Sequence, residues 1–189
     1  MRRALLSCTV VAILLALPTT AYAVPAGDSV MLTGAPAHAR DFTIFELAAS
    51  SGPNGENPTG RVRFDLFTNS FRFAGAVTCL AVTGDTAIIN FHDEIGPFGI
   101  TTIRVHDGTP DSFELVNFGR APADCSAPSA SGIEGNVSTG DITVVDAPPL
   151  PTSKEQCKNG GWRTFGAFRN QGDCVSFVAT RGKNPPSDP

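Results

Sequence analysis

Gly27-Asp28-Ser29 is the first segment whose residue types could do chemistry, because it matches the opening of a GDS-type esterase motif. Such an enzyme needs a serine nucleophile, a histidine base and an aspartate three residues before that histidine. The residues three positions before the three histidines of this chain are Ala35, Ile89 and Ile103. Because no Asp-x-x-His pair exists, we expect Ser29 to be a residue at the start of a strand.

Two further segments combine histidine with carboxylates and are candidates for metal binding or proton transfer. His92-Asp93-Glu94 and His106-Asp107 flank a predicted strand, so the two histidines could approach each other. Neither segment has the ligand spacing of a metalloprotease motif. Asp107, Asp111 and Glu114 could bind calcium, but the EF-hand pattern is absent and we prefer to interpret them as solvated turn residues. We therefore assign no catalytic, cofactor-binding or metal-binding residue.

Aromatic residues offer little for carbohydrate binding or for the subsites of a glycosidase. Trp162 is the only tryptophan of the chain, and the 13 phenylalanines are expected to fill the core. A carboxylate pair for glycoside hydrolysis is a tertiary property that the sequence does not define. We expect Trp162 to pack over a disulfide rather than to stack on a ligand.

Four of the five cysteines lie after residue 23, and in an exported protein they imply two disulfides with three possible connectivities. We favour Cys79–Cys125 and Cys157–Cys174, because a proline-rich segment separates the two pairs. Pairing across that segment is the alternative. A zinc site is disfavoured, because neither Cys-x-x-Cys nor Cys-x-x-His occurs.

Residues 1–23 have the pattern of a secretory signal peptide. Met1-Arg2-Arg3 is positive, residues 4–17 carry no charge, and Ala21-Tyr22-Ala23 is a small-x-small cleavage site. We expect cleavage after Ala23, export from the cell, and no transmembrane segment in the remaining chain. A lipoprotein box ending at Cys8 is the alternative, which the apolar residues beyond Cys8 disfavour.

The exported chain divides into a body and a tail of opposite charge. We expect a β domain over residues 24–145, a proline-rich linker over 146–152 and a short tail over 153–189. Residues 24–151 have a net charge of −9, whereas residues 152–189 have a net charge of +3. The negative total argues against a nucleic-acid partner. The tail cations form a candidate contact surface of six residues, namely Lys154, Lys158, Arg163, Arg169, Arg181 and Lys183.

The body has the alternation of apolar and polar residues that is typical of half-buried strands. In Arg61–Phe67 the apolar residues Val62, Phe64 and Leu66 share one face. Similar patterns predict strands over 30–33, 41–47, 71–79, 86–91, 100–105, 112–118 and 142–145, with residues 121–140 irregular. Short strands separated by turns favour a mainly β fold, either an antiparallel sandwich or a small barrel.

The tail predicts a small helical hairpin stapled by a disulfide. Ser153 and Gln156 have the spacing of a capping box, and Asn159-Gly160-Gly161 would end that helix. Asn170 would cap a second helix that stops at Gly182. Because so short a unit buries little surface, it needs the Cys157–Cys174 crosslink.

Parts of the sequence resemble an uncharacterised family of small exported bacterial β-domains, some of which follow choice-of-anchor modules at the cell envelope. The resemblance lies in residues 77–87, 107–113 and 51–60. The tail is similar to a C-terminal segment of diverse exported bacterial proteins, through SKEQCKNGGW at 153–162 and FRNQGDCVSF at 168–177. The resemblance implies export and a β-rich body, and it supplies no catalytic residue.

These observations favour a secreted module without catalytic activity, outside the cell or at its envelope. Its partner would be an anionic cell-wall polymer or another extracellular protein. A secreted inhibitor that presents residues 50–60 is the first alternative. A small hydrolase built on His92 or His106 is the second alternative, and it requires a cleft that brings one of them to a carboxylate.

Overall fold

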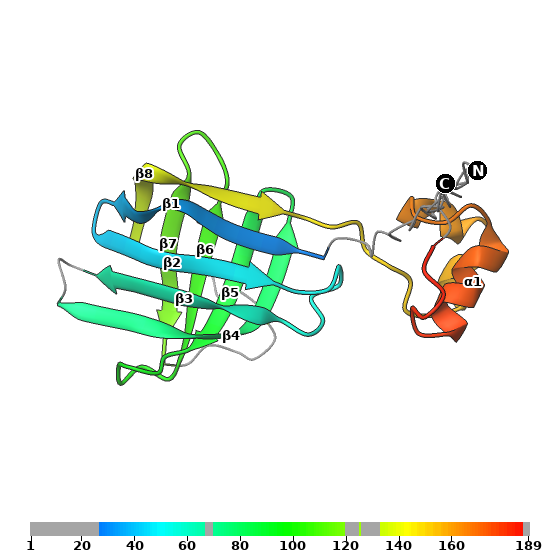
Figure 1. Ribbon diagram of the computed structural model, residues 1–189, viewed down its shortest axis with the longest axis horizontal. Helices are drawn as coiled ribbons and strands as arrows, with labels where there is room; N and C mark the ends of the chain where they lie inside the picture. Colours follow the sequence, from blue (N-terminus) through cyan, green and yellow to red (C-terminus); the bar gives the residue numbers. More distant parts are fainter. Residues whose placement is uncertain (1–26, 67–69, 120–124, 126–132, 187–189) are drawn as a thin grey trace, which may run out of the picture.

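The computed structural model describes residues 27–66, 70–119, 125 and 133–186. The predicted signal peptide, its cleavage site and Cys8 lie outside the described residues. Eight antiparallel strands pair in chain order, and the last strand returns to the first to close a barrel (Figure 1). The strands are β1 (Ser29–Ala39), β2 (Phe42–Ser50), β3 (Thr59–Leu66), β4 (Phe71–Thr83), β5 (Thr86–His92), β6 (Ile100–His106), β7 (Ser112–Phe118) and β8 (Ile133–Val145). The predicted mainly β fold is therefore confirmed in its barrel form.

Phenylalanine rings fill the interior of the barrel. The ring of Phe64 lies 4.7 Å from that of Phe73 and 5.1 Å from that of Phe113, and Phe91 packs at 6.2 Å. An eight-stranded barrel is just wide enough for side chains to fill it, and here these rings and the surrounding aliphatic residues form one buried cluster.

Not every phenylalanine belongs to this core, so that expectation is wrong in part. Phe71 is 46% exposed and Phe118 is 50% exposed, and both contact the partly buried Phe98 outside the core cluster. These rings lie where β4 begins and β7 ends, which is the end of the barrel away from the tail.

A β-bulge in β4 changes the predicted alternation. Phe73 and Val77 are buried, but the register with β5 shifts between Val77 and Cys79, after which Leu80 is the buried residue. A bulge inserts one residue and turns the following side chains to the other face. Cys79 is thereby placed on the outer surface, where it forms a disulfide with Cys125.

β1 and β8 extend furthest beyond the ranges that the sequence pattern predicts. β1 continues through Gly34 and Pro36 to Ala39, with register shifts against both of its neighbours. β8 begins at Ile133, so residues 133–140 are a strand and not irregular as predicted. Backbone pairing to β1 and β7 holds this polar, glycine-containing segment in place despite its low intrinsic strand propensity.

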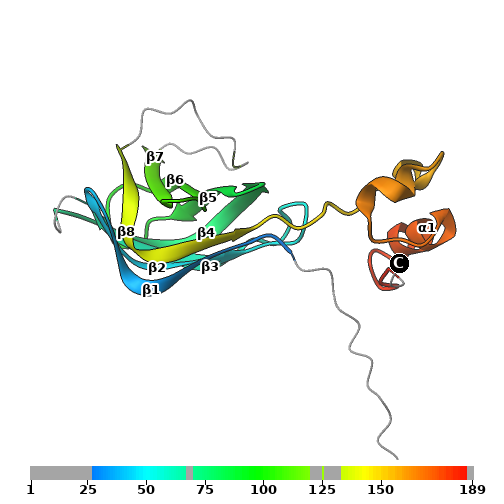
Figure 2. The same ribbon diagram turned by 90° about the horizontal axis from the view of Figure 1, so that it is seen from above.

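The tail lies beyond the end of the barrel at which β8 ends, and an extended linker joins the two (Figures 1 and 2). It contains two 3₁₀ turns, η1 (Glu155–Cys157) and η2 (Gly161–Phe165), followed by the helix α1 (Gln171–Ala179). The first helix of the predicted hairpin is therefore wrong, because 3₁₀ turns take its place. Asn170 caps α1 as predicted, because its side chain accepts a hydrogen bond from the Asp173 backbone N–H at 2.9 Å. Among the described residues, no helix has the length and apolar character needed to cross a bilayer.

Candidate functional site

The histidines that the sequence singled out do not come together. Register pairs Thr86 with His106 at one end of β5 and β6, and His92 with Ile100 at the other. Six residues of strand separate these ends, which corresponds to about 20 Å. The expectation that His92 and His106 could approach each other across one strand is therefore wrong, because antiparallel pairing sends them to opposite ends of the barrel.

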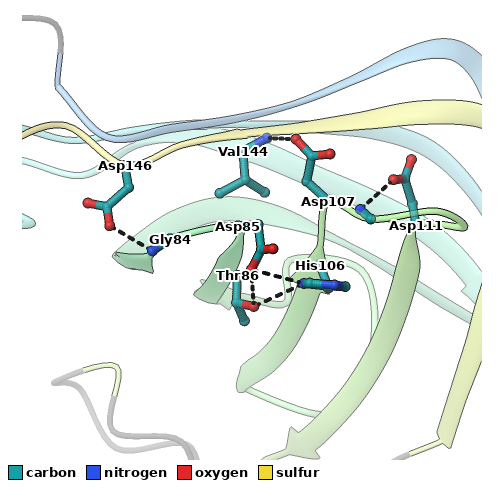
Figure 3. Close-up of polar contacts among 9 residues, drawn as sticks. Gly84, Asp85, Thr86, His106, Asp107, Asp111, Val144 and Asp146 are labelled. Carbon is teal, nitrogen blue, oxygen red and sulfur yellow. Dashed lines mark hydrogen bonds and ion pairs between the residues drawn. The ribbon is translucent and has the colours of Figure 1, made fainter.

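His106 lies at the tail end of the barrel beside two polar residues (Figure 3). Its Nδ1 is 3.3 Å from the Asp85 carboxylate and 3.2 Å from the Thr86 hydroxyl. The His106 and Asp85 side chains are 43% and 65% exposed, so solvent surrounds both groups. The pair stands on the surface and lines none of the three cavities described along the chain.

The candidate calcium ligands bind backbone amides instead. Asp111 accepts hydrogen bonds from the Ile142 N–H at 2.7 Å and the Gly108 N–H at 3.0 Å, one with each carboxylate oxygen. Asp107 accepts from the Val144 N–H at 3.0 Å (Figure 3). These carboxylates pair with β8 beyond Asn136, where the register with β7 ends.

Asp111 is buried, so the interpretation of this segment as solvated turn residues is wrong for it. Glu114 is also largely buried and pairs with Arg104 at 2.6 Å across β6 and β7. Within the described residues, no group of three or more His, Cys, Asp or Glu side chains could hold a metal ion.

Two further aspartates fix the start of the linker. The Asp146 carboxylate accepts from the Gly84 N–H at 2.7 Å, and the Asp28 carboxylate accepts from the Ala147 N–H at 3.0 Å. Burial raises the pKa of the Asp28 carboxyl. The hydrogen bond from Ala147 lowers this pKa in part, and repulsion from the charges of Asp146 and Glu56 raises it. Ser29, the residue after Asp28, is the first residue of β1, as expected from the absence of an Asp-x-x-His pair.

The tail core is built around its disulfide. Cys157 and Cys174 are bonded and fully buried, and together with the buried Phe168 they form a cluster separate from the barrel core. Trp162 packs against this cluster as predicted, and the Arg163 guanidinium lies 4.7 Å from the Trp162 ring centroid. Both favoured disulfides, Cys79–Cys125 and Cys157–Cys174, are present.

Leu150 connects the tail to the loop between β2 and β3. The Asn54 side-chain amide donates to the Leu150 carbonyl and accepts from the Leu150 N–H, both at 3.2 Å. The Leu150 side chain packs against the tail cluster. Leu150 therefore contacts both the loop of the barrel and the core of the tail. Sequence reasoning did not identify this contact, because its two residues are 96 positions apart.

The six predicted basic contact residues are all exposed. Lys158 pairs with Glu155 at 3.2 Å, and Arg163 stacks on Trp162. Within the described part of the chain, Lys154, Arg181 and Lys183 have no acidic partner. The tail therefore presents several cations that are free to contact an anionic surface.

Comparison with known proteins adds no further identification. No family model, no curated protein and no solved structure matches this chain.

Proposed function

We propose that this chain is an exported binding module without catalytic activity, which attaches to an anionic extracellular polymer through the cations of its tail. The observation that carries the proposal is the exposure of all six cations on a compact, disulfide-bonded unit that an extended linker holds beyond the barrel. The two disulfides fit an oxidising compartment outside the cytoplasm.

The barrel supports a structural role for the body. Its interior is filled by side chains. The carboxylates that could have done chemistry, such as Asp107 and Asp111, are engaged with backbone amides. We infer that the barrel is a rigid carrier for the tail. Its net negative charge would repel an anionic polymer, so attachment would be directed to the tail.

The inhibitor hypothesis receives less support from the loop it depends on. Asn54, in the middle of the loop between β2 and β3, is hydrogen-bonded to Leu150 of the linker. Gly52 N–H donates to the Glu56 carbonyl at 2.7 Å, which folds the loop on itself. A loop that is hydrogen-bonded to the linker and folded on itself is poorly suited to enter the cleft of a protease.

The proposal is tested by binding residues 24–189, with both disulfides formed, to immobilised polyphosphate and to purified bacterial cell wall. Because counterions are released when cations bind a polyanion, affinity should fall about tenfold or more between 50 and 200 mM salt. Binding that does not change with salt would contradict the proposal.

A matched pair of double variants locates the contact. Lys154→Gln with Lys183→Gln removes two exposed tail charges, whereas Arg40→Gln with Arg72→Gln removes two exposed charges from the barrel, where the side chains are 80% and 65% exposed. We expect the tail variant to bind several-fold more weakly and to have a smaller salt dependence. Equal losses in the two variants would show that the tail is not the binding surface.

A further inference from the structure

A groove of about 860 Å³ lies where three segments meet: the loop between β2 and β3, the linker, and the end of α1 with the residues that follow it. Its volume is in the range of sites that bind small molecules. Its walls are mostly apolar and come from all three segments, through Pro53, Leu150, Pro151, Phe177, Val178 and Pro185. Ser51, Asn57 and Thr152 also line the groove, but its surface is more apolar than polar, which favours a ligand with an apolar chain.

Arg181 places one cation in this groove. It follows α1 in a left-handed backbone conformation with φ 53°, and its N–H donates to the Val178 carbonyl at 3.2 Å. The next residue, Gly182, donates its N–H to the Phe177 carbonyl at 2.9 Å. The end of the helix is therefore hydrogen-bonded in a defined turn, which fixes the position from which the Arg181 side chain extends.

The charge of Arg181 is not compensated by an acidic residue of the described chain. Glu56 also lines the groove, but its carboxylate accepts the Asn54 N–H at 2.8 Å and is turned into its own loop. The groove therefore combines apolar walls with one guanidinium that has no anionic partner.

We propose that the groove binds a medium-chain aliphatic carboxylate, with the chain against the apolar walls and the carboxylate on Arg181. A guanidinium binds a carboxylate through two parallel hydrogen bonds, and the apolar walls would remove the alkyl chain of the ligand from water. The inference goes beyond the attachment of the tail to a polymer, because it concerns a groove to which Arg181 alone of the six tail cations contributes, and a ligand of a different class.

Calorimetric titration of residues 24–189 with octanoate and with 1-octanol tests the proposal. The two ligands have the same chain length and differ in charge. We expect octanoate to bind about tenfold more tightly, the ratio that one charge-assisted hydrogen-bonded contact supplies. Equal affinity for the two ligands, or tighter binding of a short peptide with a free carboxylate, would overturn the proposal.

Variants at Arg181 decide whether the contact is the one described. Arg181→Gln should remove the preference for octanoate over 1-octanol, and Arg181→Glu should reverse it in favour of octylammonium. Lys183→Gln serves as the control, because it removes a neighbouring exposed charge that does not line the groove. An Arg181→Gln protein that still prefers octanoate, with its Trp162 fluorescence unchanged, would overturn the assignment.

The same variants separate this inference from the proposed function. Arg181→Gln and Lys183→Gln each remove one tail charge, so they should weaken polyphosphate binding to a similar extent, whereas only Arg181→Gln should affect octanoate. Polymer binding without octanoate binding would contradict the groove alone, and octanoate binding without polymer binding would contradict the attachment alone.

Discussion

Asp28 is a nearly buried aspartate at the point where β1 begins and the linker leaves the barrel. It is 4% exposed, and its carboxylate accepts the Ala147 N–H at 3.0 Å. Burial and the nearby charges of Asp146 and Glu56 raise the pKa of its carboxyl above the ordinary value. The folded protein therefore retains the Asp28 proton to a higher pH than the unfolded chain does.

The raised pKa of Asp28 predicts how stability depends on pH. An aspartate in the unfolded chain loses its proton near pH 4, and the folded protein loses it at a higher pH. Between these two values the folded state binds more protons, so the Asp28 contribution to stability falls as pH rises through that window and is constant above it. Asp28→Asn should remove this contribution, while its amide oxygen still accepts the Ala147 N–H.

Urea unfolding between pH 3 and pH 7 checks this prediction. We expect Asp28→Asn to gain stability relative to the wild type as pH rises. Asp28→Ala is the control, and it should be less stable by about 1 kcal/mol, because the Ala147 N–H is left without its acceptor. A difference between the wild type and Asp28→Asn that is the same at every pH would contradict the assignment.

At the scale of the elements, β8 shows how the barrel closes where a strand is paired with a neighbour on one edge only, since β8 beyond Asn136 pairs with β1 but not with β7. Register with β7 ends at Asn136, and the carboxylates of Asp107 and Asp111 accept the N–H groups of Val144 and Ile142 beyond it. The loop between β6 and β7 thereby supplies hydrogen-bond acceptors to the edge of β8 that β7 does not reach. The hydrogen bonds from backbone N–H groups to these carboxylates stabilise the fold. They occupy the oxygen atoms that a catalytic or calcium-binding aspartate would use to contact its ligand.

Asp111→Ala should destabilise the barrel by about 2–4 kcal/mol, because two backbone N–H groups lose a charged acceptor. The midpoint of urea unfolding measures this loss. Asp141→Ala is a matched control, since Asp141 is an exposed aspartate of β8 that accepts only from the Thr143 hydroxyl among the described contacts. It should change stability by no more than about 0.5 kcal/mol. Similar losses in the two variants would contradict the role assigned to Asp111.

Calcium removal should leave the thermal midpoint of the barrel unchanged. Both oxygens of Asp111 already accept backbone hydrogen bonds, so a cation would have to displace them. Differential scanning calorimetry in 1 mM calcium and in excess chelator tests this expectation. An increase in the midpoint with calcium would show that the aspartates of this loop bind the ion.

The strand pattern was readable from the sequence wherever one face of a strand is buried. Val62 and Phe64 alternate with charged residues, and the structure buries both of them. The pattern failed in residues 133–140, because Val137 is the only buried residue of that stretch and pairing with neighbouring strands determines its conformation. Local preference cannot predict a strand that long-range pairing imposes.

The tail illustrates a similar limit for helices. Gln156 does reach back as in a capping box, and its side chain accepts the N–H groups of Thr152 and Ser153. The turn nevertheless ends after Cys157, because the backbone of Lys158 is extended with ψ 164°, and Gly160, with φ 85°, precedes a separate second turn. The groove beside Arg181 was also beyond prediction, since it depends on three segments that only the folded chain brings together.

The tail disulfide should determine whether the tail is folded. A crosslink that closes a loop of 17 residues contributes about 3 kcal/mol, and among the described residues the tail core has only three that are buried. Cys157→Ser with Cys174→Ser should therefore make the tail sensitive to trypsin, which cleaves after residues such as Lys158 and Arg163. Mass spectrometry of the fragments measures this.

The matched control is Cys79→Ser with Cys125→Ser, which removes the disulfide of the barrel and leaves that of the tail. Its tail should resist trypsin as the wild-type tail does. If both double variants lose the tail at the same rate, the stability of the tail depends on the whole molecule and not on its own crosslink.

At the scale of the whole molecule, the barrel and the tail have separate cores that meet through a short linker. The barrel core is one cluster of strand residues, and the tail core is a second cluster around Cys157 and Cys174. Leu150 contacts both parts of the molecule: its backbone is hydrogen-bonded to Asn54 of the barrel, and its side chain packs against the tail core. Two cores joined by few contacts are expected to unfold as two cooperative units.

Trp162 makes this expectation measurable, because it is the only tryptophan of the chain and it lies in the tail. Its fluorescence reports unfolding of the tail, whereas far-ultraviolet circular dichroism is dominated by the eight strands of the barrel. Because the two cores are separate, we expect the two signals to give different midpoints in a thermal scan. A single two-state transition would instead require both probes to give the same midpoint. Asn54→Ala should leave the dichroism midpoint unchanged and move the fluorescence midpoint by at most a few degrees. Coincident transitions in the wild type would show that the barrel and the tail form one cooperative unit, and that the linker transmits stability between them.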